Sequence, residues 1–304
     1  MEQNNKAQQN EDSTELLKMV IRIISIYKNA IKEVKTIESD DPISRIKKDI
    51  LLPYMVLTYG KALSAYRLLN GYSLMDLHPS VQGVSNDTFT IFDVVRALYE
   101  CCLQSSFLIK RYQSEDEIQY MARWWYCRAY SERALLAKNR SMSNDQLEEE
   151  AKQMNDYKLD IANIYGSISD IDKQEFGFDK LTGLAKWPTP GKLYQIVGIH
   201  KSQHDHIYKY YSIYAHCEPL SMLQVSDAFR KGDVDVNISI VTQGVYVLQL
   251  LVLSLRYMSL AFPELDVFVK KRPGFDVFLV SAEVFWARSI EEARKASTLR
   301  NSRF

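Results

Sequence analysis

The sequence predicts an all-α protein, folded as an irregular multi-helix bundle. Apolar residues recur at helical spacing through most of the chain, as Val20, Ile24, Tyr27 and Ile31 do near its start. Capping and stop signals such as Asp41-Pro42 and Asn70-Gly71 separate these stretches. No repeat of fixed period is present, which argues against a solenoid.

The predicted helices differ in length and are separated by short polar segments. They cover residues 13–38, 42–70, 88–112, 115–139, 143–164, 193–198, 205–216, 236–262 and 277–295. Pro53 is expected to kink the second helix, and residues 71–86 form a loop. The short connection after residue 112 favours an antiparallel hairpin of the two helices around it. A small β-hairpin at 267–278 is a weaker expectation.

Polarity divides the chain into four regions. Residues 1–12 read as a disordered polar tail, and residues 13–165 as an N-terminal helical region. Residues 166–192, broken by glycines and by Trp187-Pro-Thr-Pro-Gly, form an irregular connector. Residues 193–304 form a C-terminal helical region, which we expect to pack on the first as one domain.

Bulk composition favours a cytoplasmic protein without a membrane span. The 38 basic and 38 acidic residues cancel, so no global field draws the chain to nucleic acid or lipid. The four cysteines lack a C-x-x-C pair, and the polar start does not resemble a signal peptide. The apolar stretch 244–255 has 12 residues, too few to span a bilayer, and is interpreted as a buried core helix.

A polar stripe runs along the otherwise apolar helix 88–112. Asp93, Arg96, Glu100 and Gln104 share one face of this helix. Such a stripe either meets water as a surface ion-pair row or lines an internal polar site, and the sequence leaves both open.

Four of the five histidines lie within 17 positions, at 200, 204, 206 and 216. His200 and His204 have the i,i+4 spacing of metal ligands, but no H-E-x-x-H motif accompanies them. We therefore expect capping and surface roles for His200, His204 and His206, and no metal or other cofactor.

The most distinctive stretch is Tyr208-Lys-Tyr-Tyr-Ser-Ile-Tyr-Ala-His216. On an α-helix Lys209, Ser212 and His216 share one face at i, i+3 and i+7. An imidazole that moves a 2′-hydroxyl proton, beside a cation that stabilises the transition-state charge, suits phosphodiester cleavage. The same trio also suits an ordinary hydrogen-bonded helix end.

These residues resemble motifs of a family of bacterial helical proteins that carries R-x-x-x-E in one helix and Y-R-x-L-S-x-x-x-H in a later one. Arg96 and Glu100 match the first motif, and Tyr208, Ser212 and His216 match the second. The resemblance covers about residues 45–260 and extends to HEPN-type helical proteins, whose ribonuclease toxins carry an arginine followed four to six residues later by a histidine. Lys209 stands in the arginine's place, and lysine lacks the bidentate fork that suits phosphate.

What the resemblance implies is a HEPN-like core and a metal-independent ribonuclease of bacterial toxin or phage-defence type, acting on RNA as a homo-oligomer. His216, Lys209 and Ser212 are then the catalytic candidates. The supporting polar cluster would comprise Arg96, Glu100, Tyr208 and Tyr211.

Two other functions remain open from the sequence. One is a non-catalytic helical interaction module, or regulatory subunit of a defence complex, in which Arg96, Glu100 and His216 fix helix register. The other is a small-ligand sensor with a pocket between helices. The 19 tyrosines offer stacking surfaces for single-stranded bases, but in a bundle they more often fill the core.

Overall fold

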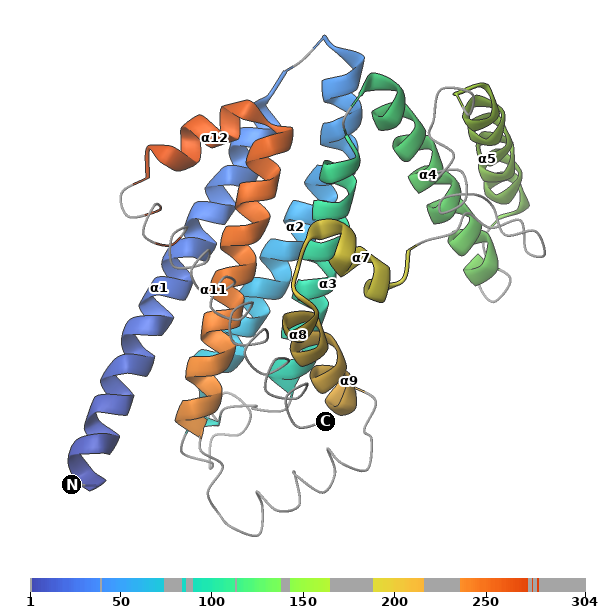
Figure 1. Cartoon of the computed structure of the whole chain (residues 1–304). Helices are drawn as coiled ribbons and strands as arrows, with labels where there is room; N and C mark the ends of the chain where they lie inside the picture. Colours follow the sequence, from blue (N-terminus) through green and yellow to red (C-terminus); the bar gives the residue numbers. More distant parts are fainter. Residues whose placement is uncertain are drawn as a thin grey trace, which may run out of the picture.

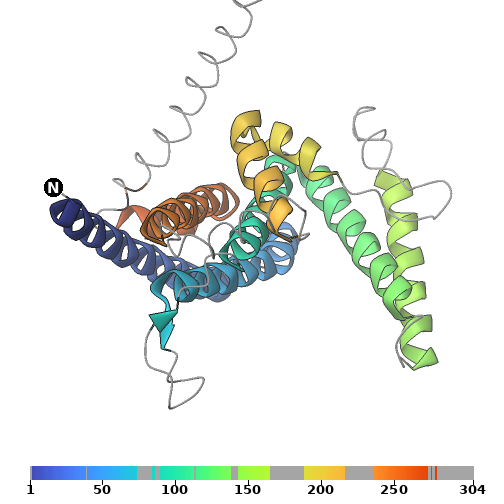
Figure 2. The ribbon, with the colours of Figure 1, turned by 90° about the horizontal axis from the view of Figure 1, so that it is seen from below.

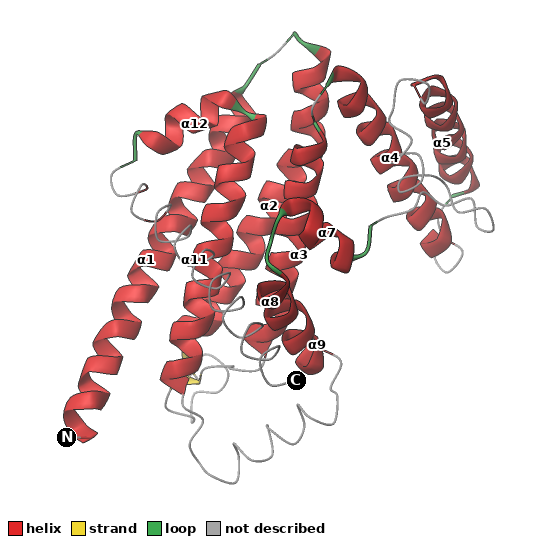
Figure 3. Ribbon diagram, in the orientation of Figure 1, coloured by secondary structure: helices red, strands yellow, loops and turns green. Residues whose placement is uncertain are grey.

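The computed structural model confirms the all-α class (Figure 3). It describes residues 2–38, 40–73, 84–85, 90–112, 114–137, 143–164, 188–215 and 236–272, together with 275 and 278. Apart from a pair of two-residue antiparallel strands, β1 (Tyr72–Ser73) and β2 (Val84–Ser85), the elements in these ranges are helical.

Four long helices form the body of the molecule. They are α1 (Glu2–Thr36), α2 (Pro42–Asn70), α3 (Thr90–Arg111) and α11 (Val236–Ala261). Each of α1 and α3 packs against both α2 and α11, so the four helices enclose one core (Figure 1). The largest fully buried side chains include Trp124, Tyr27, Tyr99, Tyr211 and Phe107.

The ends of α2 follow from its sequence. The Asp41 carboxylate accepts hydrogen bonds from the Ser44 hydroxyl and from the backbone N–H groups of Ser44 and Ile43, and these bonds hold the pKa of Asp41 below its usual value. Gly71 ends the helix at φ 77°, a conformation that glycine adopts without a Cβ clash. The helix continues through Pro53.

The apolar helix α11 packs closely on α1. A Cβ placed on Gly244 would lie 2.8 Å from Cδ2 of Leu16, so glycine permits this approach. The buried hydroxyls of Tyr27 and Ser254 share a hydrogen bond of 2.7 Å across the two helices. Residues Val241–Ala261 are long and apolar enough to cross a membrane, but 67% of the apolar window is buried inside the protein, as in a core helix.

Helices α4 (Glu115–Ala137) and α5 (Asn144–Ile164) form an arm beside the body. Arg123 Nε pairs with Asp160 at 2.7 Å, and Arg133 pairs with Glu150 at 2.8 Å, so ion pairs join the two helices. The predicted hairpin of α3 with α4 is wrong. After the short connection α4 turns away from α3 and packs along α5 and against α2 (Figure 1).

Short helices complete the described fold. They are α7 (Pro190–Val197), α8 (Lys201–His204), the π-helix η3 (Asp205–Tyr210), α9 (Tyr211–Ala215) and α12 (Pro263–Lys270). The predicted hairpin at 267–278 is also wrong, since Pro263 at the first helical position starts α12 instead. Residues 2–12, expected as a tail, belong to α1. Most of the predicted connector and helix 277–295 lie outside the described residues.

Candidate functional site

Helix α7 is anchored to the body by its carboxyl end. Lys110 Nζ donates to the carbonyl oxygens of Ile196 and Val197 at 3.2 and 2.8 Å, and the Tyr257 hydroxyl donates to Val197 at 2.9 Å. Gly198, at φ 83°, then ends the helix in the left-handed conformation. The chain thereby turns into α8 and η3 alongside α3.

Residues 200–215, which include α8, η3 and α9, form one segment that packs on α3. His204 is buried at the centre of this contact. Its ring lies between those of Tyr194 and Tyr208, at centroid distances of 4.2 and 5.2 Å, and both pairs are nearly parallel. Its Nδ1 shares a hydrogen bond of 3.0 Å with the Tyr99 hydroxyl. Burial lowers the pKa of His204, with Lys209 and Lys201 acting in the same direction and Asp205 opposing. A neutral imidazole therefore serves as packing here.

Arg96 and Glu100 meet this cluster from α3. Nε of Arg96 donates to Oε1 of Glu100 at 3.2 Å, and the guanidinium lies 4.9 Å from the centroid of the Tyr208 ring. The two side chains are 16% and 34% exposed, so the polar stripe is neither a solvated face nor a sealed interior. The two sequence motifs therefore lie side by side in space through Arg96 and Tyr208.

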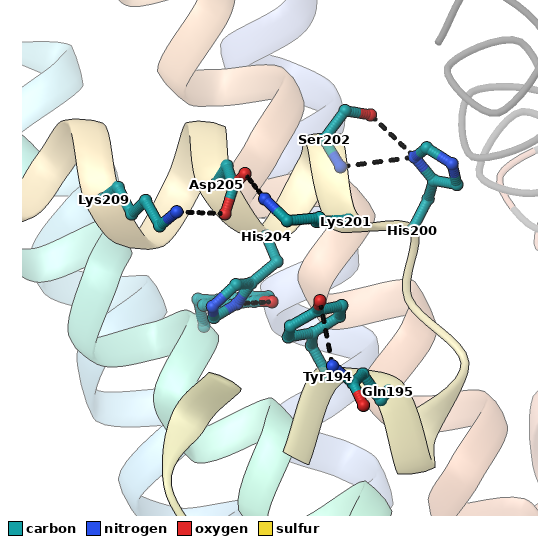
Figure 4. Close-up of polar contacts among 9 residues, drawn as sticks. Tyr194, Gln195, His200, Lys201, Ser202, His204, Asp205 and Lys209 are labelled. Atoms are coloured by element: carbon teal, nitrogen blue, oxygen red, sulfur yellow. Dashed lines mark hydrogen bonds and ion pairs between the residues drawn. The ribbon is translucent and has the colours of Figure 1, made fainter. Parts of the chain in front are cut away.

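The opposite face of the segment carries a row of charges. Asp205 Oδ2 pairs with Lys201, and Oδ1 lies 3.0 Å from Lys209 Nζ (Figure 4). Both lysine side chains are about two-thirds exposed, at 63% and 65%. Burial raises the pKa of Asp205, but hydrogen bonds and charges from the two lysines outweigh it and leave the pKa below its usual value. Lys209 is thus paired: its side chain runs toward Asp205, while the His204 ring turns to the other side of the helix.

Ser212 and Tyr211 take structural positions at the start of α9. The Ser212 hydroxyl donates to the Tyr208 carbonyl oxygen four residues earlier. Tyr211 is fully buried, and burial raises its pKa while the neighbouring Gln243 side chain lowers it. The phenol stays protonated at neutral pH.

A second aromatic group borders this region. Phe92 of α3 stacks on Tyr214 at 4.3 Å, and the exposed His206 ring stacks on Tyr210 at 5.6 Å. The Tyr210 and Tyr214 hydroxyls lie 3.2 Å apart. These rings pack mainly against one another, as the core-filling interpretation of the tyrosines expects.

The histidines with metal-ligand spacing do not converge. Nδ1 of His200 accepts a hydrogen bond from the Ser202 backbone N–H at 3.2 Å, while His204 turns into the bundle (Figure 4). Within the described part of the chain, no group of three histidine, cysteine, aspartate or glutamate side chains is placed to hold a metal ion.

Gln104, the last residue of the polar stripe, belongs to a separate pocket of 260 Å³ between α2, α3 and α4. Trp125 Nε1 donates to the Tyr54 hydroxyl at 3.1 Å, which donates to Gln104 at 3.2 Å. Arg128 and Glu132 form an ion pair at its rim. This volume falls below the usual range for ligand pockets, so this pocket does not support the small-ligand sensor.

The structure thus joins Arg96, Glu100 and Tyr208, and separates Lys209 from them. His216 lies outside the described residues, one position after the end of α9. Sequence reasoning missed Tyr99 and Tyr194, and gave His204 a surface role. The Lys209–Asp205 pair could be predicted from its i,i+4 spacing. The hydrogen-bond partner of His204 comes from another helix and could not.

Comparison with protein families, curated proteins and solved structures finds no match to this chain.

Proposed function

We propose that the protein is a non-catalytic helical interaction module, in which the cluster around His204 and Arg96 fixes segment 200–215 on α3. One observation carries the proposal. Except for Tyr211, whose buried hydroxyl has no hydrogen-bond partner among the described residues, each candidate catalytic or supporting side chain that the structure describes is already engaged by a partner within the chain. A catalytic group needs a free donor, acceptor or proton at the substrate.

The positions of the side chains support this interpretation. Arg96 is tied to Glu100 and Tyr208, Lys209 to Asp205, and Ser212 to the backbone. Binding an RNA phosphate through Lys209 would require this cation to give up its carboxylate partner. The exposed ion pair of Lys209 with Asp205 contributes little to stability. The pair therefore lowers the local positive charge but does not block the site.

A HEPN-like ribonuclease is the second candidate, and the contact of Arg96 with Tyr208 favours it. This contact brings the R-x-x-x-E helix against the segment that leads to His216. In such an enzyme Arg96 supplies the bidentate cation that Lys209 lacks, and His216 moves the proton. RNA is its substrate, and the role is a toxin or a phage-defence nuclease.

Induced expression in bacteria separates the two functions. Total-RNA integrity and growth are followed for wild type, His216→Ala, Arg96→Ala and Lys209→Ala, with soluble protein measured for each. The interaction module predicts intact RNA in every culture, and a lowered thermal midpoint for purified Arg96→Ala, because Glu100 and Tyr208 lose their shared partner.

RNA cleavage by wild type that disappears in a folded His216→Ala variant would overturn the interaction module in favour of the nuclease. Loss of cleavage in Arg96→Ala with retention in Lys209→Ala would then identify Arg96 as the cation. Lys201→Ala is the matched control, because it removes an equally exposed lysine from the same carboxylate.

A further inference from the structure

The outer face of α2 carries an apolar groove. Its floor consists of the successive turns Leu52-Pro53 and Val56-Leu57, with Gly60 after them. Val56 and Leu57 are 46% and 49% exposed, although both are large apolar residues. The groove has a volume of 750 Å³, and its residues recur at helical i, i+3, i+4 and i+7 spacing along one face. An exposed apolar stripe of this kind indicates a contact surface.

Gly60 points to a helix as the occupant. A Cβ added at this position would meet nothing within 4 Å, so the chain itself gives no steric reason for glycine in the middle of a helix. Glycine there weakens the helix, but it lets another backbone approach closely. Ser64, the next small residue on the same face, bonds its hydroxyl back to the Gly60 carbonyl at 3.0 Å.

The charges of the stripe identify which helix fits. Asp49 lies six residues before position 55 and Lys61 six residues after it, with the apolar floor between them. An antiparallel copy of α2 that crosses near Val56 would place each Asp49 beside the other copy's Lys61. In the same register each Pro53 lies level with the other copy's Leu57, so the apolar floors of the two copies face each other. This stripe is complementary to itself, as a two-fold interface requires.

We infer that two copies of this chain pair through the groove on α2, antiparallel and crossing near Val56. The inference rests on the interaction module proposed above, and names a second copy as its partner. Figure 2 shows α2 on the other side of α3 from α8 and α9, so the pairing leaves segment 200–215 uncovered.

The positive charge of the groove favours one other class of occupant. Lys48 turns its ammonium to the carbonyl oxygens of Lys35 and Ile37 at the end of α1, at 2.7 and 2.9 Å. This contact removes Lys48 from the pairing, but Lys35 and Lys61 still outnumber Asp49. An acidic helix of another protein is the occupant that such an excess would otherwise favour.

Sedimentation of the full-length chain over a range of micromolar concentrations tests the inference. Wild type is expected at about twice the monomer mass of 35.3 kDa. Asp49→Lys and Lys61→Asp each create two like-charge contacts, and are expected to weaken the dimer by roughly tenfold or more. An equimolar mixture of the two single variants, and the double variant Asp49→Lys/Lys61→Asp, are expected to recover it, because both restore opposite charges.

Leu57→Glu is expected to abolish pairing, whereas Leu260→Glu, at a position 68% exposed on α11, keeps it. Circular dichroism confirms that each variant is folded. A monomeric wild type, or a dimer insensitive to Leu57→Glu, overturns the inference. The inference is also overturned if the double variant Asp49→Lys/Lys61→Asp does not recover the dimer, because the swapped charges restore pairing only between two copies of this chain. None of these results depends on RNA cleavage, so the pairing and the proposed function fail separately.

Discussion

The two faces of segment 200–215 are held by different kinds of interaction. The inner face buries His204 and Tyr211 among aromatic rings contributed by α3, α7 and α11. The outer face carries the Lys201–Asp205–Lys209 row, whose partners all come from the segment itself. Side chains on the inner face therefore contribute tertiary stability, whereas those on the outer face contribute local helix stability at most. The adjacent titratable residues His204 and Asp205 thus have opposite roles.

The largest expected effect comes from emptying the inner face. Tyr211→Ala is expected to lower the free energy of unfolding by about 3–5 kcal/mol, because it removes a fully buried ring. Tyr211→Phe keeps the ring and should lose less than about 1 kcal/mol. Chemical denaturation of the three proteins measures the difference. Equal losses in the two variants would show that the ring is not what holds the segment.

The pH dependence of stability tests the burial of His204. Its pKa in the folded protein lies below the usual 6.5, so the unfolded chain binds the proton first, and stability falls as the pH drops below about 6.5. Partial desolvation by its neighbours lowers the pKa of His206 in the same direction, but its ring is exposed, so solvent screening makes its contribution the smaller one. His204 contributes a slope of at most about 1.4 kcal/mol per pH unit.

Denaturation of wild type and His204→Gln between pH 7.5 and about 5.5 separates the two histidines. The variant should be less stable at high pH but lose less on acidification, retaining the part due to His206. An unchanged slope would mean that His204 titrates as an exposed group does.

Tyr99→Phe probes the hydrogen bond between α3 and the segment. The change removes the hydroxyl that lies 3.0 Å from His204 Nδ1 and keeps the ring, so a loss of about 1 kcal/mol is expected. The loss should be non-additive with His204→Gln in a double-mutant cycle. Additive losses would argue against the direct bond.

The smallest effect is expected on the outer face. Lys209→Ala should change the free energy of unfolding by less than about 0.5 kcal/mol, because its ion pair with Asp205 is exposed and lies within one helical segment. High salt should reduce even this difference. A loss comparable to that of Tyr99→Phe would remove the distinction between the faces.

Long helices were predictable from the sequence because each carries its own signals. Asp41-Pro42 and Gly71 define α2 without reference to the rest of the chain, and the apolar spacing of α3 and α11 reflects burial that any bundle provides. The α3–α4 hairpin was predicted wrongly because loop length does not determine which neighbour a helix prefers. Helix α4 packs along α5, with ion pairs such as Arg123–Asp160 that no local pattern shows.

The candidate site was predictable only in part. The two motifs were identified as related, and Arg96 does contact Tyr208. Placing Lys209 and Ser212 on one catalytic face assumed a uniform α-helix, whereas residues 205–210 form a π-helix, whose wider turn changes which side chains align. The environment of His204 depends on Tyr99, 105 residues away in sequence, and no spacing rule reveals such a contact.

Two glycines inside helices give the chain different evolutionary constraints. Gly244 has Leu16 against it, so selection for a stable monomer is enough to retain it. Gly60 faces open space, and alanine there would strengthen α2 by about 1 kcal/mol. A library selected for heat resistance alone should therefore enrich alanine at position 60, and one selected for pairing should keep glycine.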